Sequence, residues 1–121
     1  MGRNDGRVLR VDRETGRLIT ILDNLRQPSG LAFQSANVLC FSESGANQVK
    51  CMDLTNHGVT VVAGTGEAGF SGDGGSAECA KLNRPYGISF DLAGALYIAD
   101  TGNQRIRRVR LGNGFGQCHD R

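Results

Sequence analysis

Residues 64–111 read GTGEAGFSGDGGSAECAKLNRPYGISFDLAGALYIADTGNQRIRRVRL, and this stretch decides the fold. Glycines crowd its first part, where they suit a compact loop that needs positive φ angles. Three apolar runs of strand length follow, separated by turn residues: PYGISF, ALYIA and RIRRV. This pattern predicts short antiparallel strands after a loop, with any helix confined to a single turn near residues 77–82.

The same unit occurs earlier in the chain. Residues 28–54 align without a gap onto residues 85–111, and Pro28 and Pro85 are 57 residues apart. A repeated supersecondary unit predicts an array whose members bury their apolar faces against one another. Seven aligned pairs are identical: Pro28/Pro85, Gly30/Gly87, Phe33/Phe90, Ala36/Ala93, Leu39/Leu96, Gly45/Gly102 and Leu54/Leu111.

The order GFSGDGG, Leu82 to Pro85, ALYIADTGN and RIRRV resembles an NHL repeat, the blade unit of a β-propeller. Residues 6–30 also resemble gluconolactonase and strictosidine-synthase-like propellers, which share a six-bladed architecture. The resemblance implies an all-β fold, a partial β-propeller of four-stranded antiparallel blades. The strand patterns amount to about two to two and a half blades, too few to close a ring of ~4 to 8.

The strand patterns divide this single propeller fragment, residues 1–121, into five parts. They are a partial blade at 6–24, a complete blade at 27–63, a glycine-rich inter-blade loop at 64–83, a partial blade at 84–111 and a tail at 112–121. Open ends of this kind leave unpaired strand edges and apolar faces. The chain is therefore expected to be a piece of a longer protein or to assemble with copies of itself, and alone to self-associate or to be unstable.

Composition narrows the function classes. The formal charge is only +2, so no overall field favours nucleic acid. No run approaches the ~20 apolar residues of a membrane span, and the start MGRNDGRVLR lacks the apolar core of a signal peptide. A soluble protein without membrane contact is expected, and its compartment stays open.

Four cysteines, Cys40, Cys51, Cys79 and Cys118, form no CxxC pair, and the two histidines lie far apart in the sequence. No metal site is therefore expected. Cys40 and Cys51 fall on neighbouring predicted strands about the turn at residues 44–47. Two buried free thiols are favoured there, with a cross-strand disulfide as the alternative.

The glycine-rich loop contains a pattern typical of dinucleotide sites, Gly64-x-Gly66-x-x-Gly69 after a strand. That site needs a helix to open directly after the glycines, because the helix N-terminus holds the pyrophosphate. Here FSGDGG follows instead, which favours a compact loop and no cofactor. Asp73 is expected to accept backbone N–H bonds and fix a turn rather than to bind calcium.

Catalysis finds little support in the sequence. In gluconolactonase-like propellers a metal-binding Asn or Asp can occupy the position between Pro and Gly at the start of the innermost strand. Those positions hold Ser29 and Tyr86 here, and no GxSxG nucleophile motif is present. No catalytic residue is expected. The alternative is a fragment or subunit of a gluconolactonase-like or lyase-like enzyme whose catalytic residues lie in other blades.

Function is therefore expected at a binding surface of a protein-binding or assembly scaffold. Loops that enter a blade and loops between its second and third strands meet at one rim. We expect this rim to contact a protein partner, with RNA as a weaker candidate. Arg107 and Arg108 are expected on the outer blade face, in solubility and packing roles. The predicted rim residues are Arg84, Tyr86, Asn103, Gln104 and Arg105.

Overall fold

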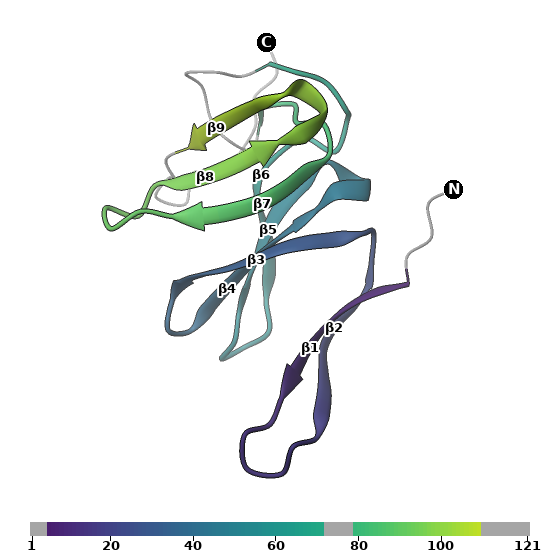
Figure 1. Ribbon diagram of the computed structural model, residues 1–121, viewed down its shortest axis with the longest axis vertical. Helices are drawn as coiled ribbons and strands as arrows, with labels where there is room; N and C mark the ends of the chain where they lie inside the picture. The colour runs from purple at the N-terminus through teal and green to yellow at the C-terminus, as the bar shows by residue number, and fades with distance from the viewer. Residues whose placement is uncertain (1–4, 72–78, 110–121) are drawn as a thin grey trace.

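The computed structural model describes residues 5–71 and 79–109 (Figure 1). These residues form antiparallel sheets of two, four and three strands, which follow one another as successive blades. No α-helix occurs within either described range. The all-β partial propeller predicted from the sequence is confirmed.

Each sheet is built from strands in chain order, so every strand pairs with its sequence neighbour. The innermost strands of the second and third sheets, β3 and β7, lie against each other. The first sheet comprises β1 (Gly6–Val11) and β2 (Leu18–Leu25). The second comprises β3 (Pro28–Ser35), β4 (Val38–Glu43), β5 (Gln48–Asp53) and β6 (Val59–Ala63). The third comprises β7 (Pro85–Phe90), β8 (Leu96–Asp100) and β9 (Arg105–Val109).

The 57-residue repeat is reproduced in hydrogen bonds. A carboxylate at the end of the second strand caps the loop that enters the same blade. Glu43 Oε2 accepts a bond of 2.7 Å from the N–H of Arg26. Asp100 Oδ1 accepts a bond of 2.7 Å from the N–H of Asn83. Both blades therefore begin with equivalent loops, each capped by the carboxylate at the equivalent position of its repeat.

Short helical turns connect the second and third strands of both blades. One 3₁₀ helix spans Ser44–Ala46 and another spans Thr101–Asn103, each one turn long. Residue 79, within the turn expected near residues 77–82, is also in 3₁₀ conformation, and residues 77 and 78 lie outside the described part. The expectation that helix would be confined to that turn is wrong. A tight antiparallel connection favours this geometry, because each turn ends on a left-handed residue, Asn47 or Gln104, that reverses the chain.

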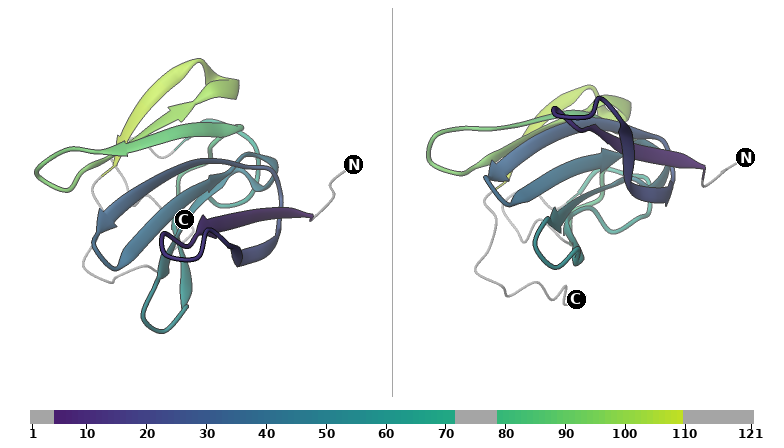
Figure 2. Two further views of the ribbon diagram at one scale, coloured as in Figure 1. Left: turned by 60° about the horizontal axis from the view of Figure 1, so that its bottom comes forward. Right: turned by 90° about the horizontal axis from the view of Figure 1, so that it is seen from below.

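The sheets lie one against the next (Figure 2), and a cluster of buried apolar side chains joins each neighbouring pair. The cluster between the first and second sheets contains Val8, Leu25, Leu39 and Phe41. The cluster between the second and third sheets contains Val49, Ala63, Leu82, Leu96 and Ile98. Each cluster is shared by two neighbouring sheets, so each blade is stabilised chiefly by its neighbour.

The two innermost strands approach so closely that only glycine fits at one position. A Cβ on Gly30 would lie 2.5 Å from the carbonyl oxygen of Tyr86 and 3.3 Å from the Cα of Gly87. The hydroxyls of Ser42 and Ser44 donate hydrogen bonds across the same interface, to the carbonyl oxygens of Tyr86 and Pro85. The backbone at the start of β7 is thus fixed by the preceding blade.

Replacing Gly30 with alanine is expected to lower the free energy of unfolding by about 1–3 kcal/mol, because the new methyl group must push the β7 backbone away. The matched control is Gly87→Ala at the equivalent repeat position, where an added Cβ meets no atom within 4 Å. Urea unfolding measures both. Equal effects of the two substitutions would mean that β3 and β7 do not approach as described.

Cys40 and Cys51 form a disulfide between β4 and β5. The favoured expectation of two buried free thiols is therefore wrong. The reason lies in the register, which places Cys40 directly opposite Cys51 in the antiparallel pair. Cys79 is disulfide-bonded as well, whereas Cys118 lies outside the described residues. Such bonds persist in oxidising compartments.

Candidate functional site

The rim consists of the loop that enters the third blade and the turn between β8 and β9. These two segments are joined by a hydrogen bond of 2.6 Å from the N–H of Gly102 to the carbonyl oxygen of Asn83. Gly102 is also closely packed, since a Cβ there would lie 2.4 Å from the side chain of Asn83. The predicted rim residues therefore come from two segments in direct contact.

Arg84 and Tyr86 carry exposed side chains on a fixed backbone. Arg84 has a φ of 57°, and its N–H donates a bond of 2.8 Å to Asn47 Oδ1 of the preceding blade. Tyr86 is 52% exposed, although its carbonyl oxygen is held by Ser42. A large side chain presented by a rigid backbone loses little conformational entropy on binding, which suits an anchor.

The side chain of Asn103 makes hydrogen bonds within the fold instead of projecting from the rim. Its side-chain amide donates bonds of 2.8 Å to the carbonyl oxygen of Gly69 and to Asp100 Oδ2. The side chain is half-buried. Asn103 thus ties the glycine-rich loop to the turn. Gln104 is exposed and takes a left-handed backbone with φ 56°.

Arg105 lies over an aromatic ring that the sequence analysis did not single out. Its guanidinium carbon is 4.4 Å from the centroid of Phe70, and that of Arg107 is 4.7 Å from the same centroid. Phe70 is partly exposed beside them. The available signal was an aromatic residue in a loop followed by a strand with alternating arginines, a combination that favours cation–π contacts.

Arg107 is buried, so its expected place on the outer face is wrong. It forms an ion pair with Asp100, with 3.0 Å between Arg107 Nη1 and Asp100 Oδ2. It also donates bonds of 3.0 Å to the carbonyl oxygen of Lys81 and 2.6 Å to that of Ser71. Arg108, the next residue, is exposed as expected. Strand alternation explains the difference, because neighbouring side chains point to opposite faces.

The equivalent acid of the middle blade is paired in the same way. Lys50 Nζ lies 2.6 Å from Glu43 Oε1, and Lys50 is the repeat counterpart of Arg107. Both blades therefore keep a carboxylate that caps the entry loop and a base that neutralises it. These four charged groups serve the fold, which leaves Arg84 and Arg105 as the cations of the rim.

Two carboxyls with a lowered pKa lie in turns away from the rim. The N–H of Glu14 is the largest cause of the lowered pKa of Asp12, and the N–H of Ala95 is the largest cause for Asp91. Asp12 directly follows β1, and Asp91 directly follows β7. Their ionisation supports turns rather than the rim.

The glycine-rich loop is compact where the structure describes it. Gly64 has a φ of 98°, and a Cβ there would lie 2.4 Å from the carbonyl oxygen of Asn47. Ser71 forms an isolated antiparallel bridge with Lys81, so the loop folds back on itself. These contacts favour the compact-loop interpretation over a dinucleotide site. Asp73 lies outside the described residues.

Among the described residues, no group of three or more His, Cys, Asp or Glu side chains is placed to hold a metal ion. Within the same residues, no helix has the length and apolar character needed to cross a membrane.

Comparison with curated proteins finds similar stretches in much longer chains. The chain is 32% identical over 90 residues to the Protein SUPPRESSOR OF QUENCHING 1, chloroplastic, of Arabidopsis thaliana, covering 74% of this chain and 8% of that protein. It is 33% identical over 109 residues to Teneurin-4 of Homo sapiens, covering 80% of this chain and 4% of that protein. The chain thus spans less than a tenth of the length of these relatives. No family model matches it.

Solved structures decide the fold. A protein of unknown function from Bacteroides thetaiotaomicron superposes with a TM-score of 0.74 at 20% identity, covering 88% of this chain and 30% of that chain. The chain is a partial β-propeller. A chain of the nidogen/laminin complex superposes with a TM-score of 0.62 at 18% identity, covering 88% of this chain and 38% of that chain. At these identities the likeness concerns the propeller fold alone.

Proposed function

We propose that this partial propeller is of the NHL type and serves as a protein-interaction module through its rim. The observation that carries the proposal is the exposed Tyr86 side chain on a backbone that the preceding blade holds in place. Arg84, two residues before Tyr86, is also exposed, and its backbone N–H donates to Asn47 Oδ1. Tyrosine and arginine are enriched among the residues that dominate binding energy at protein interfaces.

The charge of the rim indicates the kind of partner. Arg84 and Arg105 are exposed, whereas the nearby carboxylate of Asp100 is buried and paired with Arg107. An acidic protein surface complements this arrangement. The fold likeness to a chain of the nidogen/laminin complex is consistent with a propeller that takes part in protein assembly.

The enzyme alternative gains no support from the two positions where such propellers can place a metal ligand. The hydroxyl of Ser29 bonds to the carbonyl oxygen of Gln27, and Tyr86 contributes a phenol. Neither residue supplies a carboxylate, the ligand type that hard divalent cations favour.

Photocrosslinking tests which face meets a partner. The crosslinker p-benzoylphenylalanine would replace Tyr86 in one variant and Thr60, on the outermost strand β6, in a control variant. The proposal predicts a single protein crosslinked from position 86 and absent from position 60. Crosslinking of that protein from position 60 alone would place the interface on the outer strand and contradict the proposal.

Replacing Arg84 and Tyr86 together with alanine is expected to weaken binding of that purified partner by about 1–4 kcal/mol. Thermal stability should change little, because both side chains are exposed. Isothermal titration and a melting curve measure the two effects. Unchanged affinity in a folded double variant would exclude these residues as anchors. An equal loss of affinity and stability would assign Tyr86 a structural role.

A further inference from the structure

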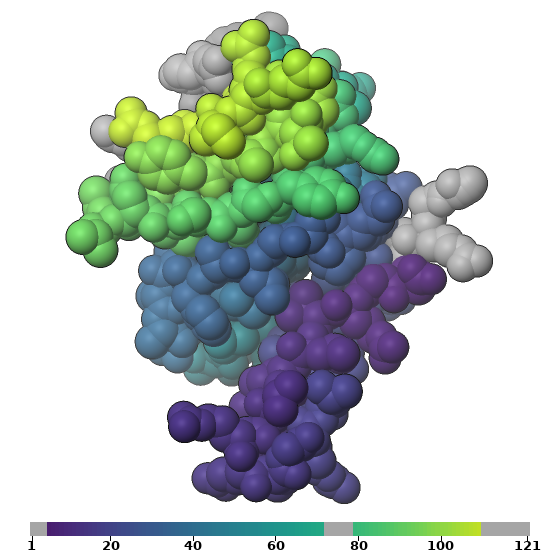
Figure 3. All heavy atoms as spheres, viewed as in Figure 1, coloured from purple at the N-terminus to yellow at the C-terminus, as the bar shows by residue number. Residues whose placement is uncertain are grey.

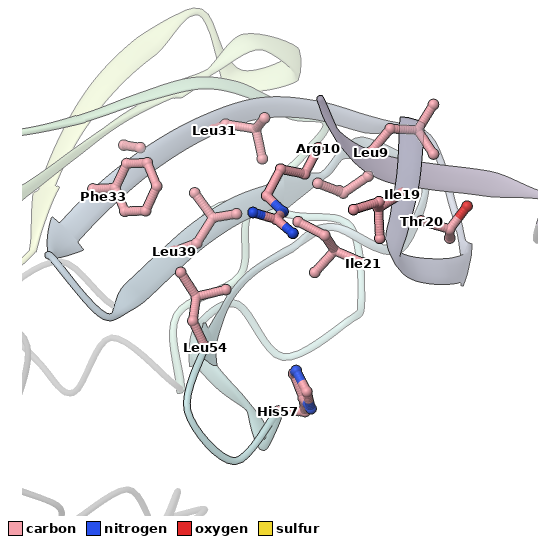
Figure 4. A pocket seen from close by; sticks show the side chains of 12 residues that line it. Leu9, Arg10, Ile19, Thr20, Ile21, Leu31, Phe33, Leu39, Leu54 and His57 are labelled. Carbon is pink, nitrogen blue, oxygen red and sulfur yellow. The ribbon is translucent and has the colours of Figure 1, made fainter. Parts of the chain in front are cut away.

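A hollow of about 780 Å³ lies between the β1–β2 hairpin and the middle sheet (Figure 4). Figure 3 shows the hairpin projecting beside that sheet. Leu31 and Phe33 of β3 line the hollow and remain 53% and 59% exposed. Its volume falls within the ~300–1,000 Å³ of small-molecule sites, which are mostly apolar and contain a few polar groups.

Arg10 supplies the charge in this hollow. Apart from Arg10, Thr20 and His57, the lining side chains are apolar, and none of the described residues that line the hollow is acidic. Arg10 lies on the same face of β1 as the buried Val8, and its side chain points into the hollow (Figure 4). The hollow therefore combines apolar walls with the permanent positive charge of a guanidinium.

The repeated hairpin geometry indicates that the fold does not require an arginine at this position. The β1–β2 and β5–β6 hairpins have the same turn length and strand pairing, so Arg10 corresponds to Cys51 of the middle blade. Cys51 is buried and forms the disulfide with Cys40. A charged side chain at the equivalent of a buried, uncharged position indicates a role other than packing.

The charge of Arg10 is not neutralised by an ion pair. None of the ion pairs found within the described ranges involves Arg10. Asp12 interacts with it only weakly, since the N–H of Glu14 is the largest cause of the lowered pKa of Asp12 and Arg10 is a minor one. A guanidinium beside apolar walls attracts an anion more strongly than one in open water, because the local dielectric constant is lower.

We propose that the hollow binds a small amphipathic carboxylate. The planar guanidinium of Arg10 can donate two parallel hydrogen bonds to the carboxylate group. The apolar body of the ligand lies along Leu31 and Phe33. This site is separate from the rim, because none of the five predicted rim residues lines the hollow. Failure of the ligand experiment would therefore leave the protein-interaction proposal intact.

Methyl spectra of the full chain, labelled at Ile, Leu and Val, measure both the affinity and the place of binding. The probe is octanoate. It should shift the methyl signals of Ile21, Leu31 and Leu39, which line the hollow, and leave that of Ile98 in the other cluster unchanged. Octylammonium has the same chain and the opposite charge, so it should bind at least about tenfold more weakly.

Arg10→Gln keeps much of the side-chain length and removes the charge. It should weaken octanoate binding about tenfold or more and leave binding of neutral 1-octanol within about twofold. The matched control, Arg108→Gln, changes an exposed arginine of β9 and should leave both affinities unchanged.

Two further variants test the apolar part of the site. Phe33→Ser should weaken binding of both octanoate and 1-octanol about threefold or more, because it removes apolar area from the wall. Ile106→Ser, at another exposed apolar position, should weaken neither. Circular dichroism establishes that each variant is folded.

Equal binding of octanoate and octylammonium would overturn the proposal, as would a folded Arg10→Gln chain that keeps its octanoate affinity. Shifts of similar size throughout the chain would also overturn it, because they indicate nonspecific binding. So would hollow methyl signals that do not respond to octanoate. If sedimentation then shows a dimer, a second copy of the chain occupies the hollow in place of the carboxylate.

Discussion

Replacing Arg107 with alanine is expected to lower the free energy of unfolding by about 3–5 kcal/mol. Asp100 is fully buried, and the substitution would leave its carboxylate without the guanidinium 3.0 Å away. The carbonyl oxygens of Lys81 and Ser71 would lose a donor at the same time. Urea unfolding followed by circular dichroism measures the change.

The neighbouring Arg108→Ala provides the matched control. Arg108 is exposed on the same strand, so its loss should change stability by less than about 0.5 kcal/mol. The double substitution Asp100→Leu with Arg107→Met should recover much of the stability, since an apolar pair leaves no buried charge. Similar effects of Arg107→Ala and Arg108→Ala would contradict the buried ion pair.

Phe41→Ala is expected to cost about 3–5 kcal/mol, because it removes a fully buried ring and leaves a cavity. Phe41 belongs to the cluster that joins the hairpin to the middle sheet, together with Val8 and Leu25. Native-state hydrogen exchange should therefore show β1 and β2 losing protection before β4 and β5.

Phe33→Ala is the control for this substitution, since it removes the same ring from an exposed position on the neighbouring strand. It should cost about 1 kcal/mol or less. A Phe41→Ala protein with unchanged stability, or one in which all strands lose protection together, would show that this cluster does not hold the hairpin.

Much of the fold could be predicted from the sequence because it depends on local patterns and on the repeat. The alternating apolar runs define the strands, and the pairing of Leu39 with Leu96 and of Gly45 with Gly102 identifies equivalent blades. The close approach expected of the loop glycines is also seen at Gly64. Predicting these features requires only neighbouring residues in the sequence or a comparison of the two repeats.

Contacts between distant segments could not be predicted in the same way. The Cys40–Cys51 bond depends on the register of β4 against β5, and a slip of one residue would separate the two sulfurs. The burial of Arg107 depends on the glycine-rich loop, whose Ser71 carbonyl oxygen accepts from it. Phe70 reaches the rim through the same loop. The sequence assigns these residues to strands or loops, but it does not identify the residues that they contact.

The proposed role of the rim rests on one claim. The claim is that the innermost strands of two equivalent blades pack side by side and hold Tyr86 in place. The most direct test is a nuclear Overhauser measurement between the α protons of Gly30 and Gly87 in isotope-labelled protein. The packing predicts a strong cross-peak, because a Cβ built on Gly30 would lie 3.3 Å from the Cα of Gly87. A folded protein that shows cross-peaks between β4 and β5 but none between these two glycines would contradict the claim.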